Sequence, residues 1–211
     1  MSRRGVFVTG TDTGVGKTLV AACLVQAWAA DYWKPAQTGL VDEPGDTETV
    51  ARLAEMTPDR LHPPRFALRA ALSPAAAAAL EGVAIALEDF ETPATDRPLV
   101  VEGAGGVLVP LNDRVLMIDL MARLGLPVVV VARSTLGTIN HTLLTLEALR
   151  VRRLTIAGVV LNGPPSASNR AAIEAHGRTR VLAELPRLEA VTSAAVAGFA
   201  KLMPALEAVA R

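Results

Sequence analysis

The chain of 211 residues has the length of one domain with room for a small subdomain, and 51% of its residues are apolar. Its 21 basic and 21 acidic residues balance, and aromatic residues make up 3%, which argues against a disordered chain, a nucleic-acid binder or a stacking platform for bases. Only Lys17, Lys34 and Lys201 are lysines, and the other 18 basic residues are arginines. Each lysine is therefore a candidate for a role that a planar guanidinium cannot fill.

Apolar β-branched runs alternate with helical patterns along the chain. The runs occupy residues 6–8, 99–101, 128–131, 156–161 and 181–183, and the helical patterns that follow them occupy 17–29, 115–124, 138–150, 168–177 and 192–209. The runs are continuously apolar, which indicates strands that are buried on both faces. The predicted fold is α/β, a doubly wound and mostly parallel sheet with helices on both faces.

Residues 40–95 interrupt this alternation with several prolines among short helical pieces. We expect them to form an irregular helical insertion on one edge of a single domain that spans residues 1–211. Cys23 is the only cysteine and lies in an apolar pattern, so it is expected in the core. The sequence has no signal-peptide pattern and no apolar run of about 18 residues, which predicts a cytoplasmic protein without a membrane partner.

A glycine-rich loop follows the first predicted strand and leads directly into a helix. Its sequence is Gly10-Thr11-Asp12-Thr13-Gly14-Val15-Gly16-Lys17-Thr18. Consecutive backbone amides of such a loop can surround a phosphate at the positive end of the helix. Lys17 is then expected to reach the β- and γ-phosphates of a nucleotide, and the Thr18 hydroxyl to hold Mg²⁺.

The loop is a variant of the Walker type, because its first glycine lies one residue earlier than in the plain motif. A dinucleotide-binding fingerprint does not fit, since its third glycine would fall at Leu19. The competing interpretation is a glycine-rich turn that only connects a strand to a helix. The order of strand, loop, Lys-Thr pair and helix favours phosphate binding.

Two carboxylates are candidate metal ligands. Glu102 follows the apolar run 99–101 and precedes Gly103-Ala104-Gly105-Gly106, so it is expected at a strand tip that faces the loop, where a carboxylate can bind Mg²⁺ directly or through water. A solvated strand-end glutamate is the alternative. Asp46 is expected at the N-cap of a helix that reaches Ala54, and capping alone would explain it as well as a metal contact does.

Lys34 lies in the segment Trp33-Lys34-Pro35, which the proline keeps extended, ahead of a polar turn at residues 37–39. We expect it at a strand end beside the phosphate loop, where open α/β sheets form their ligand sites. An ordinary surface lysine is the alternative. Lys201 has no polar partners in its helical pattern and is expected on the surface.

Four sequence blocks follow one another along the chain: residues 10–18, Lys34-Pro35, residues 101–106 and Leu136-Gly137-Thr138-Ile139-Asn140-His141. Together with residues 160–162 and 184–186, they make the chain resemble the dethiobiotin synthetase family over about residues 5–190. The resemblance implies a homodimeric ligase of biotin synthesis that uses ATP and Mg²⁺. Such an enzyme converts 7,8-diaminopelargonate and CO₂ into dethiobiotin, through a carbamate and a carbamic-phosphoric anhydride.

The resemblance also implies roles for individual residues. Lys34 and Lys17 become the catalytic cations, and Thr18, Asp46 and Glu102 the Mg²⁺ ligands. The implied ATP-binding residues are Thr13, Gly14, Val15, Gly16, Lys17, Thr18, Leu19, Asp46, Glu102, Gly103, Ala104, Gly105, Asn162, Gly163, Leu185, Pro186 and Arg187. Of these, Asn162 would read the adenine edge and residues 185–187 would close over the base.

The implied substrate-binding residues are Thr38, Gly137, Thr138 and Asn140. Residues 137–140 would begin a helix whose amides hold the distant carboxylate of the substrate across the dimer interface. For Asn140, capping of its own helix is the alternative.

The implied reaction brings a carbamate anion to the anionic γ-phosphate, so Lys17, Lys34 and Mg²⁺ would offset the repulsion. Ring closure by the neighbouring amine of the same molecule needs no protein nucleophile. In agreement, the sequence has no Gly-x-Ser-x-Gly motif, and its three histidines are too scattered in the sequence to suggest a triad or a metal cluster.

The chain departs from the family pattern at Gly14, where some relatives carry glutamate, and at residues 75–79, where many carry histidine after the Ser-Pro pair. Two other classes stay open. One is another P-loop ATP-dependent small-molecule ligase, although such amide-forming enzymes usually add a glutaminase domain with a nucleophilic cysteine. The other is a non-enzymatic partition-type switch ATPase, whose loop has a lysine at the position of Asp12.

Overall fold

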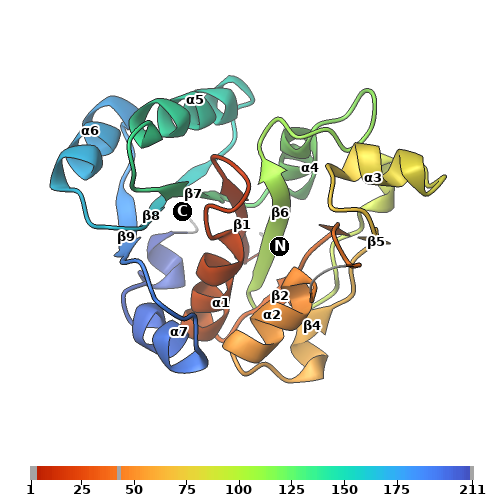
Figure 1. Cartoon of the computed structure of the whole chain (residues 1–211), viewed down its shortest axis with the longest axis horizontal. Coiled ribbons are helices and arrows are strands. Elements are labelled where there is room, and N and C mark those ends of the chain that lie inside the picture. Colours follow the sequence, from red (N-terminus) through yellow and green to blue (C-terminus); the bar gives the residue numbers. More distant parts are fainter. Residues whose placement is uncertain (1–3, 42–43, 210–211) are drawn as a thin grey trace.

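A seven-stranded parallel sheet forms the centre of the molecule (Figure 1). The structure is a computed structural model that describes residues 4–41 and 44–209, so the predicted domain limits at residues 1 and 211 lie outside the described residues. The strand order is β4-β2-β6-β1-β7-β8-β9, and every neighbouring pair is parallel. The strands are β1 (Gly5–Gly10), β2 (Asp31–Trp33), β4 (Leu61–His62), β6 (Leu99–Gly106), β7 (Val128–Arg133), β8 (Ile156–Asn162) and β9 (Val181–Leu185).

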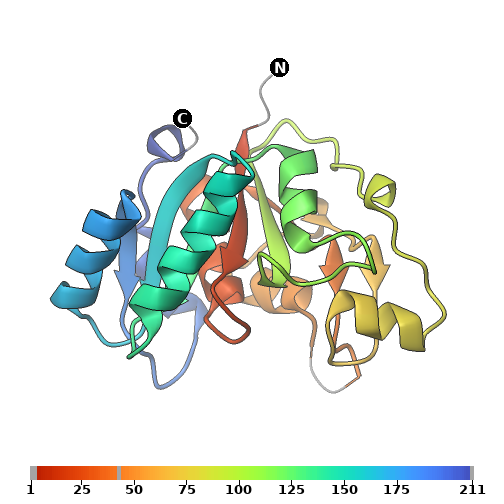
Figure 2. The same ribbon diagram turned by 90° about the horizontal axis from the view of Figure 1, so that it is seen from above.

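Helices cover both faces of this sheet. The described α-helices are α1 (Lys17–Trp28), α2 (Asp46–Leu53), α3 (Pro74–Leu80), α4 (Met117–Leu124), α5 (Thr138–Val151), α6 (Ala167–Gly177) and α7 (Ser193–Ala200), and α3 lies beyond the β2 edge of the sheet (Figure 1 and Figure 2). Short 3₁₀ helices lie at Pro58–Arg60, Leu87–Asp89 and Leu206–Ala208. Figure 1 shows α1, α2 and α7 on one side of the sheet and α4, α5 and α6 on the other, and Figure 2 shows the same layers from above. The predicted doubly wound α/β fold is confirmed.

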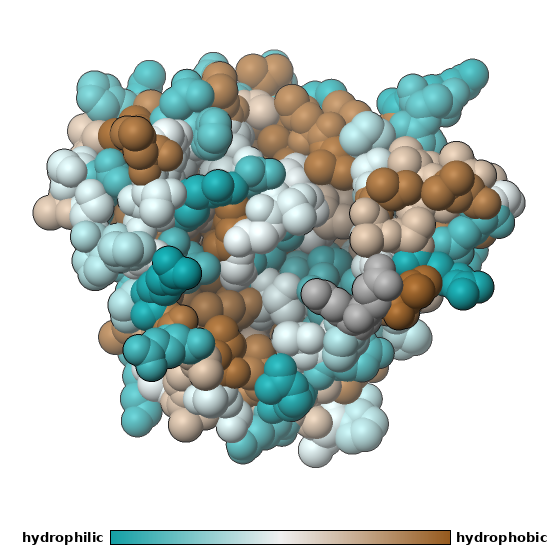
Figure 3. Space-filling model, in the orientation of Figure 1, coloured by the Kyte–Doolittle hydropathy of each residue, from teal (hydrophilic) through white to brown (hydrophobic). Residues whose placement is uncertain are grey.

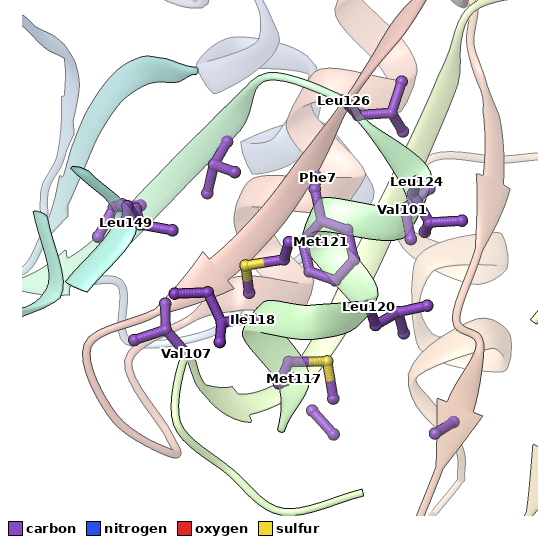
Figure 4. Packing of buried hydrophobic residues seen from close by; sticks show 14 of the residues in the cluster. Phe7, Val101, Val107, Met117, Ile118, Leu120, Met121, Leu124, Leu126 and Leu149 are labelled. Carbon is purple, nitrogen blue, oxygen red and sulfur yellow. The ribbon is translucent and has the colours of Figure 1, made fainter. Parts of the chain in front are cut away.

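Two aliphatic layers sandwich the sheet because successive side chains of a strand point to opposite faces. Phe7 and Val101 lie in the layer beneath α4, whose buried residues gather around Phe7 (Figure 4). Val8 and Val100 lie in the opposite layer with Cys23, whose burial raises the thiol pKa to about 12. The continuous apolar runs of the sequence thus supply both layers at once.

The C-terminal helix predicted at residues 192–209 is wrong in its extent. Helix α7 ends at Ala200, and Lys201 is its exposed C-cap residue. Pro204 explains the early end, since proline lacks an N–H to donate and disfavours helical geometry at the residue before it. None of the described helices has the length and apolar character needed to cross a bilayer.

The segment at residues 40–95 lies along the β2 edge of the sheet. Its strand β4 pairs with β2, and its strand β5 (Phe66–Ala67) pairs with β3 (Ala36–Gln37) in a separate two-stranded sheet. The buried carboxylate of Asp31 connects the middle and the C-terminal end of this segment to β2. It accepts a hydrogen bond from Thr95 (2.7 Å), lies 3.1 Å from His62 Nε2 and pairs with Arg97 at 3.4 Å.

Candidate active site

The phosphate loop and the ends of β1, β2 and β6 meet at one edge of the sheet, where parallel strands all present their carboxyl ends. A cavity of about 810 Å³ opens there. Its lining contains eleven of the residues predicted from sequence: Thr13, Gly14, Gly16, Lys17, Thr18, Lys34, Thr38, Asp46, Glu102, Ala104 and Gly105. The cavity also includes Gln37, Val109 and residues 71–74, none of which was among the predicted binding residues.

The phosphate loop turns sharply between β1 and α1. Gly14 and Gly16 adopt left-handed φ angles of +71° and +98°, and Gly16 is the N-cap of α1. The Nζ atom of Lys17 donates to the backbone oxygen of Asp12 at 3.1 Å, so the lysine folds over the loop. The Asp12 carboxylate pairs with Arg133 at the end of β7, at 2.7 Å, and also accepts from the Thr13 amide. The Asp12–Arg133 ion pair therefore connects the phosphate loop to the end of β7.

A group of polar side chains forms the floor of the cavity. Lys34 Nζ lies 2.5 Å from Asp46 Oδ2 and 3.1 Å from Glu102 Oε1, and it also donates to the Gly103 oxygen. Thr18 Oγ1 lies 2.9 Å from Asp46 Oδ1 and 3.0 Å from Glu102 Oε1. Lys34 is 3% exposed and Glu102 1% exposed, so neither is the surface residue that was the alternative for each.

Asp46 does not occupy the N-cap that the sequence predicted for it. The N-cap of α2 is Gly45, and Asp46 is the first helical residue. Its backbone amide donates to Gln37 Oε1 at 3.0 Å, while its carboxylate turns toward Lys34 and Thr18. The position at the positive end of a helix suits a carboxylate, and here that carboxylate belongs to the cavity floor.

The pKa values of Lys34 and Lys17 are shifted in opposite directions at the cavity floor. Burial alone would lower the pKa of Lys34, but Glu102 and Asp46 more than offset this and raise it above its usual value. Burial, together with the nearby charge of Lys34, lowers the pKa of Lys17. Burial opposes ionisation of Asp46, yet Lys34 and Thr18 hold its pKa below the usual range. Lys34 and Asp46 therefore remain a charged pair at neutral pH.

Tyr32 is a buried member of this site that the sequence analysis missed. Its hydroxyl donates to Glu102 Oε2 at 2.8 Å. Burial and the Glu102 charge raise the pKa of Tyr32 well above its usual value, so the phenol keeps its proton. A signal was present, because Tyr32 precedes Lys34 by two residues and strand side chains two apart share a face.

The residues predicted to contact the base lie at the ends of β8 and β9 and directly after them. Asn162, at the end of β8, donates from Nδ2 to the Val15 oxygen at 2.9 Å, and Gly163 donates to the Leu185 oxygen at 2.8 Å. The Leu185 side chain is buried in the core, whereas Pro186 and Arg187 are exposed. Val15, which belongs to the phosphate loop, is likewise buried. Leu19 and Gly103 belong to α1 and β6 next to the cavity but are not part of its lining.

The predicted carboxylate-binding helix start lies outside the cavity. Gly137 is the N-cap of α5 with a left-handed φ of +92°, and Asn140 is exposed. The Thr138 side chain is buried and donates to the Arg133 oxygen. Asn140 makes no side-chain hydrogen bond within the described residues, so the capping role that was its alternative is not observed.

The chain is similar in sequence to proteins of known activity over most of its length. A family model described as "AAA domain" matches residues 4–195. The chain is 61% identical over 195 residues to ATP-dependent dethiobiotin synthetase BioD of Paramagnetospirillum magneticum, with 92% of this chain and 94% of the relative covered. It is 49% identical over 201 residues to the protein of the same name from Rhodopseudomonas palustris, with 95% and 94% covered. The chain belongs to the dethiobiotin synthetase family.

A longer relative also matches this member of the dethiobiotin synthetase family. Biotin biosynthesis bifunctional protein BioCD of Bordetella avium is 59% identical over 206 residues, which are 98% of this chain and 44% of that protein. A ParA family ATPase from Chlorobium tepidum TLS has a similar structure, with a TM-score of 0.55 and 10% identity over 96% of this chain and 91% of the other. That likeness concerns the fold alone.

Gly16→Ala tests the phosphate loop of this dethiobiotin synthetase family member. A Cβ at residue 16 would lie 2.2 Å from Asn162 Nδ2, and the alanine backbone would have to adopt a φ of +98°. We expect ATP affinity, measured by calorimetry, to fall about tenfold or more. The matched control is Gly125→Ala, at a φ of +65° with open space around it. It should lower stability but leave ATP affinity unchanged, and equal affinities for Gly16→Ala and the parent would contradict the loop's role.

Proposed function

We propose that this chain is an ATP-dependent ligase that forms dethiobiotin from 7,8-diaminopelargonate and CO₂ and releases ADP and phosphate. The observation that carries the proposal is the meeting, in one cavity, of the phosphate loop and the buried Lys34–Glu102 pair in a chain of this family. Residues 1–211 would act as one P-loop domain in the cytoplasm, without nucleic-acid or membrane partners. The balanced charge of the sequence supports the lack of a nucleic-acid partner.

The donor set of the cavity floor fits Mg²⁺. Two neighbouring ligands of an octahedral Mg²⁺ are about 3 Å apart when each metal–oxygen bond is about 2.1 Å. Thr18 Oγ1 lies at 2.9 and 3.0 Å from the nearest oxygens of Asp46 and Glu102. The described residues contain no group of three or more His, Cys, Asp or Glu side chains that could hold a metal alone. Phosphates and water would complete the shell, as Mg²⁺ sites usually require.

ATP would lie along the loop, with its phosphates on the amides of residues 13–19 and on Lys17. The N-terminus of α1 would supply positive potential to these phosphates, and a Mg²⁺ held by Thr18, Asp46 and Glu102 would add to it. Asn162 and the exposed segment Pro186–Arg187 stand on the β8–β9 side of the loop and would contact the base. Ala104 and Gly105 line the cavity where β6 passes the loop, and would border the nucleotide.

The diamine would enter from the side of Lys34 and Thr38. One amine attacks CO₂ and loses a proton, which gives a carbamate anion. A carbamate oxygen then attacks the γ-phosphorus, and ADP leaves. The second amine attacks the carbonyl carbon, loses a proton and expels phosphate, which closes the ring. Lys34 and Lys17 offset the repulsion between the two anions, and ring closure within one molecule has a high effective molarity.

The substrate carboxylate would be bound by a second copy of the chain. The amides at Gly137, Thr138 and Asn140 begin a helix of 14 residues, whose positive end suits an anion. Leu136, Leu144 and Val151 are exposed in the α5 region, where Figure 3 shows apolar side chains near α4 and α5. The Thr138 amide itself donates to the Thr135 oxygen at 3.1 Å, so the Gly137 and Asn140 amides would be the donors to the carboxylate. The exposed apolar side chains support a homodimer. Light scattering that gives the mass of one 22.1 kDa chain at micromolar concentration would contradict it.

A product assay tests the proposed reaction. The purified chain is incubated with ATP, Mg²⁺, bicarbonate and 7,8-diaminopelargonate, and the products are followed by mass spectrometry. We expect dethiobiotin and ADP in equal amounts, with neither formed when the diamine is left out. Formation of ADP at the same rate with and without the diamine, and no ureido product, would exclude the proposal and favour a switch ATPase.

Lys34→Arg tests whether the reaction requires the compact ammonium group of a lysine at this position. An arginine keeps the charge, but its planar guanidinium cannot occupy the space between Asp46 and Glu102 in the same way. We expect turnover to fall about a hundredfold or more with the fold retained, because the guanidinium charge would no longer be aimed at the charge that develops during transfer. Lys201→Arg, on the exposed C-cap of α7, is the matched control and should keep normal turnover. Normal turnover by Lys34→Arg would remove Lys34 from the reaction.

A further inference from the structure

The chain contains one tyrosine, Tyr32, and its ring is fully buried in the centre of β2. It belongs to the apolar layer that also contains Val50, Leu53 and Val100. Strand β2 pairs with β6 so that Tyr32 stands opposite Val100. Glu102 lies two residues further along β6, on the same face of the sheet. The phenol therefore leans along the strand toward the Glu102 carboxylate.

The two oxygens of Glu102 have different partners. Oε1 faces Thr18 Oγ1 at 3.0 Å and Lys34 Nζ at 3.1 Å, on the cavity side. Oε2 has the Tyr32 hydroxyl, at 2.8 Å, as its hydrogen-bond partner within residues 4–41 and 44–209. Each oxygen is thus assigned to one side of the carboxylate, with the cavity on one side and the core on the other.

Nothing in the glutamate side chain itself fixes this arrangement. The terminal torsion of a glutamate is broad and roughly two-fold, so the carboxylate plane can rotate at little cost. A buried carboxylate oxygen without a donor is unfavourable, and the apolar layer around Tyr32 offers no substitute. The phenol therefore fixes the rotation of the carboxylate plane from the core side, while Thr18 and Lys34 hold the other oxygen on the cavity side.

We propose that Tyr32 is a positioning residue that acts through Glu102. Its hydroxyl holds one oxygen of the Glu102 carboxylate toward the core, which leaves the other oxygen next to Thr18 on the cavity side, and so strengthens binding of the divalent cation that accompanies the nucleotide. This inference rests on the Mg²⁺ site of the proposed function. Partners in the outer shell of a metal site typically alter metal affinity by a factor of about 10 to 100.

Tyr32→Phe removes the hydroxyl and keeps the ring. Mn²⁺ is the probe, and its binding to the chain saturated with a non-hydrolysable ATP analogue is measured by electron paramagnetic resonance. We expect the Mn²⁺ dissociation constant to rise about tenfold. The affinity for the analogue in EDTA should not change. Thr145→Val, an isosteric loss of another buried hydroxyl that bonds the His141 oxygen, is the control and should bind Mn²⁺ like the parent.

Parental Mn²⁺ affinity in a folded Tyr32→Phe variant would overturn the inference and leave the proposed function intact. A parent chain that binds no Mn²⁺ with the analogue would instead contradict the proposed metal site. A second measurement does not depend on the variant's fold. Because Tyr32 is the only tyrosine, growth on 3-fluorotyrosine labels this residue alone. We expect its ¹⁹F resonance to shift when Mg²⁺ is added to the nucleotide complex, and an unchanged resonance at saturation would also overturn the inference.

Discussion

The buried positive charge of Lys34 is the constraint on which the site depends. A lone ammonium that is 3% exposed would be strongly unfavourable, and the carboxylates of Asp46 and Glu102 compensate it. These three groups come from the β2–β3 connection, the start of α2 and the middle of β6. Their pairing therefore joins the segment at residues 40–95 to the central sheet at the cavity. Thr18 connects the same floor to the phosphate loop.

The parallel topology explains why these groups meet. Both faces of the sheet are covered by helices and filled with aliphatic side chains, so ligands can reach the strands only at their ends. Glu102 lies in the middle of β6, which continues to Gly106 beyond the strand tip that the sequence predicted, and Lys34 directly follows the adjacent strand β2; both line the cavity beside the loop that leads into α1. The two lysines then have distinct electrostatic settings, with the pKa of Lys34 raised and that of Lys17 lowered. Two different cations thus border one cavity.

Local pattern predicted much of this molecule. The continuous valine-rich runs predicted the sheet, and the order of loop, Lys17-Thr18 and helix predicted the position of the phosphate loop. Pairings between distant residues could not be predicted this way. The Asp46 carboxylate was assigned to a helix cap because sequence spacing does not reveal that Lys34 lies beside it. Tyr32 was missed because its partner is 70 residues away in sequence, and Pro204 shortened a helix whose apolar pattern continued.

In the proposed reaction, Lys17 and Lys34 allow a carbamate oxygen to approach the γ-phosphate of ATP. Transfer of oxygen from bicarbonate tests this most directly. The chain is supplied with ¹⁸O-labelled bicarbonate, unlabelled ATP, Mg²⁺ and 7,8-diaminopelargonate, and the released phosphate is examined by mass spectrometry early in the reaction. One ¹⁸O atom per phosphate is predicted, because the carbamate oxygen leaves with phosphorus at ring closure. Unlabelled phosphate released together with dethiobiotin would contradict phosphoryl transfer to the carbamate.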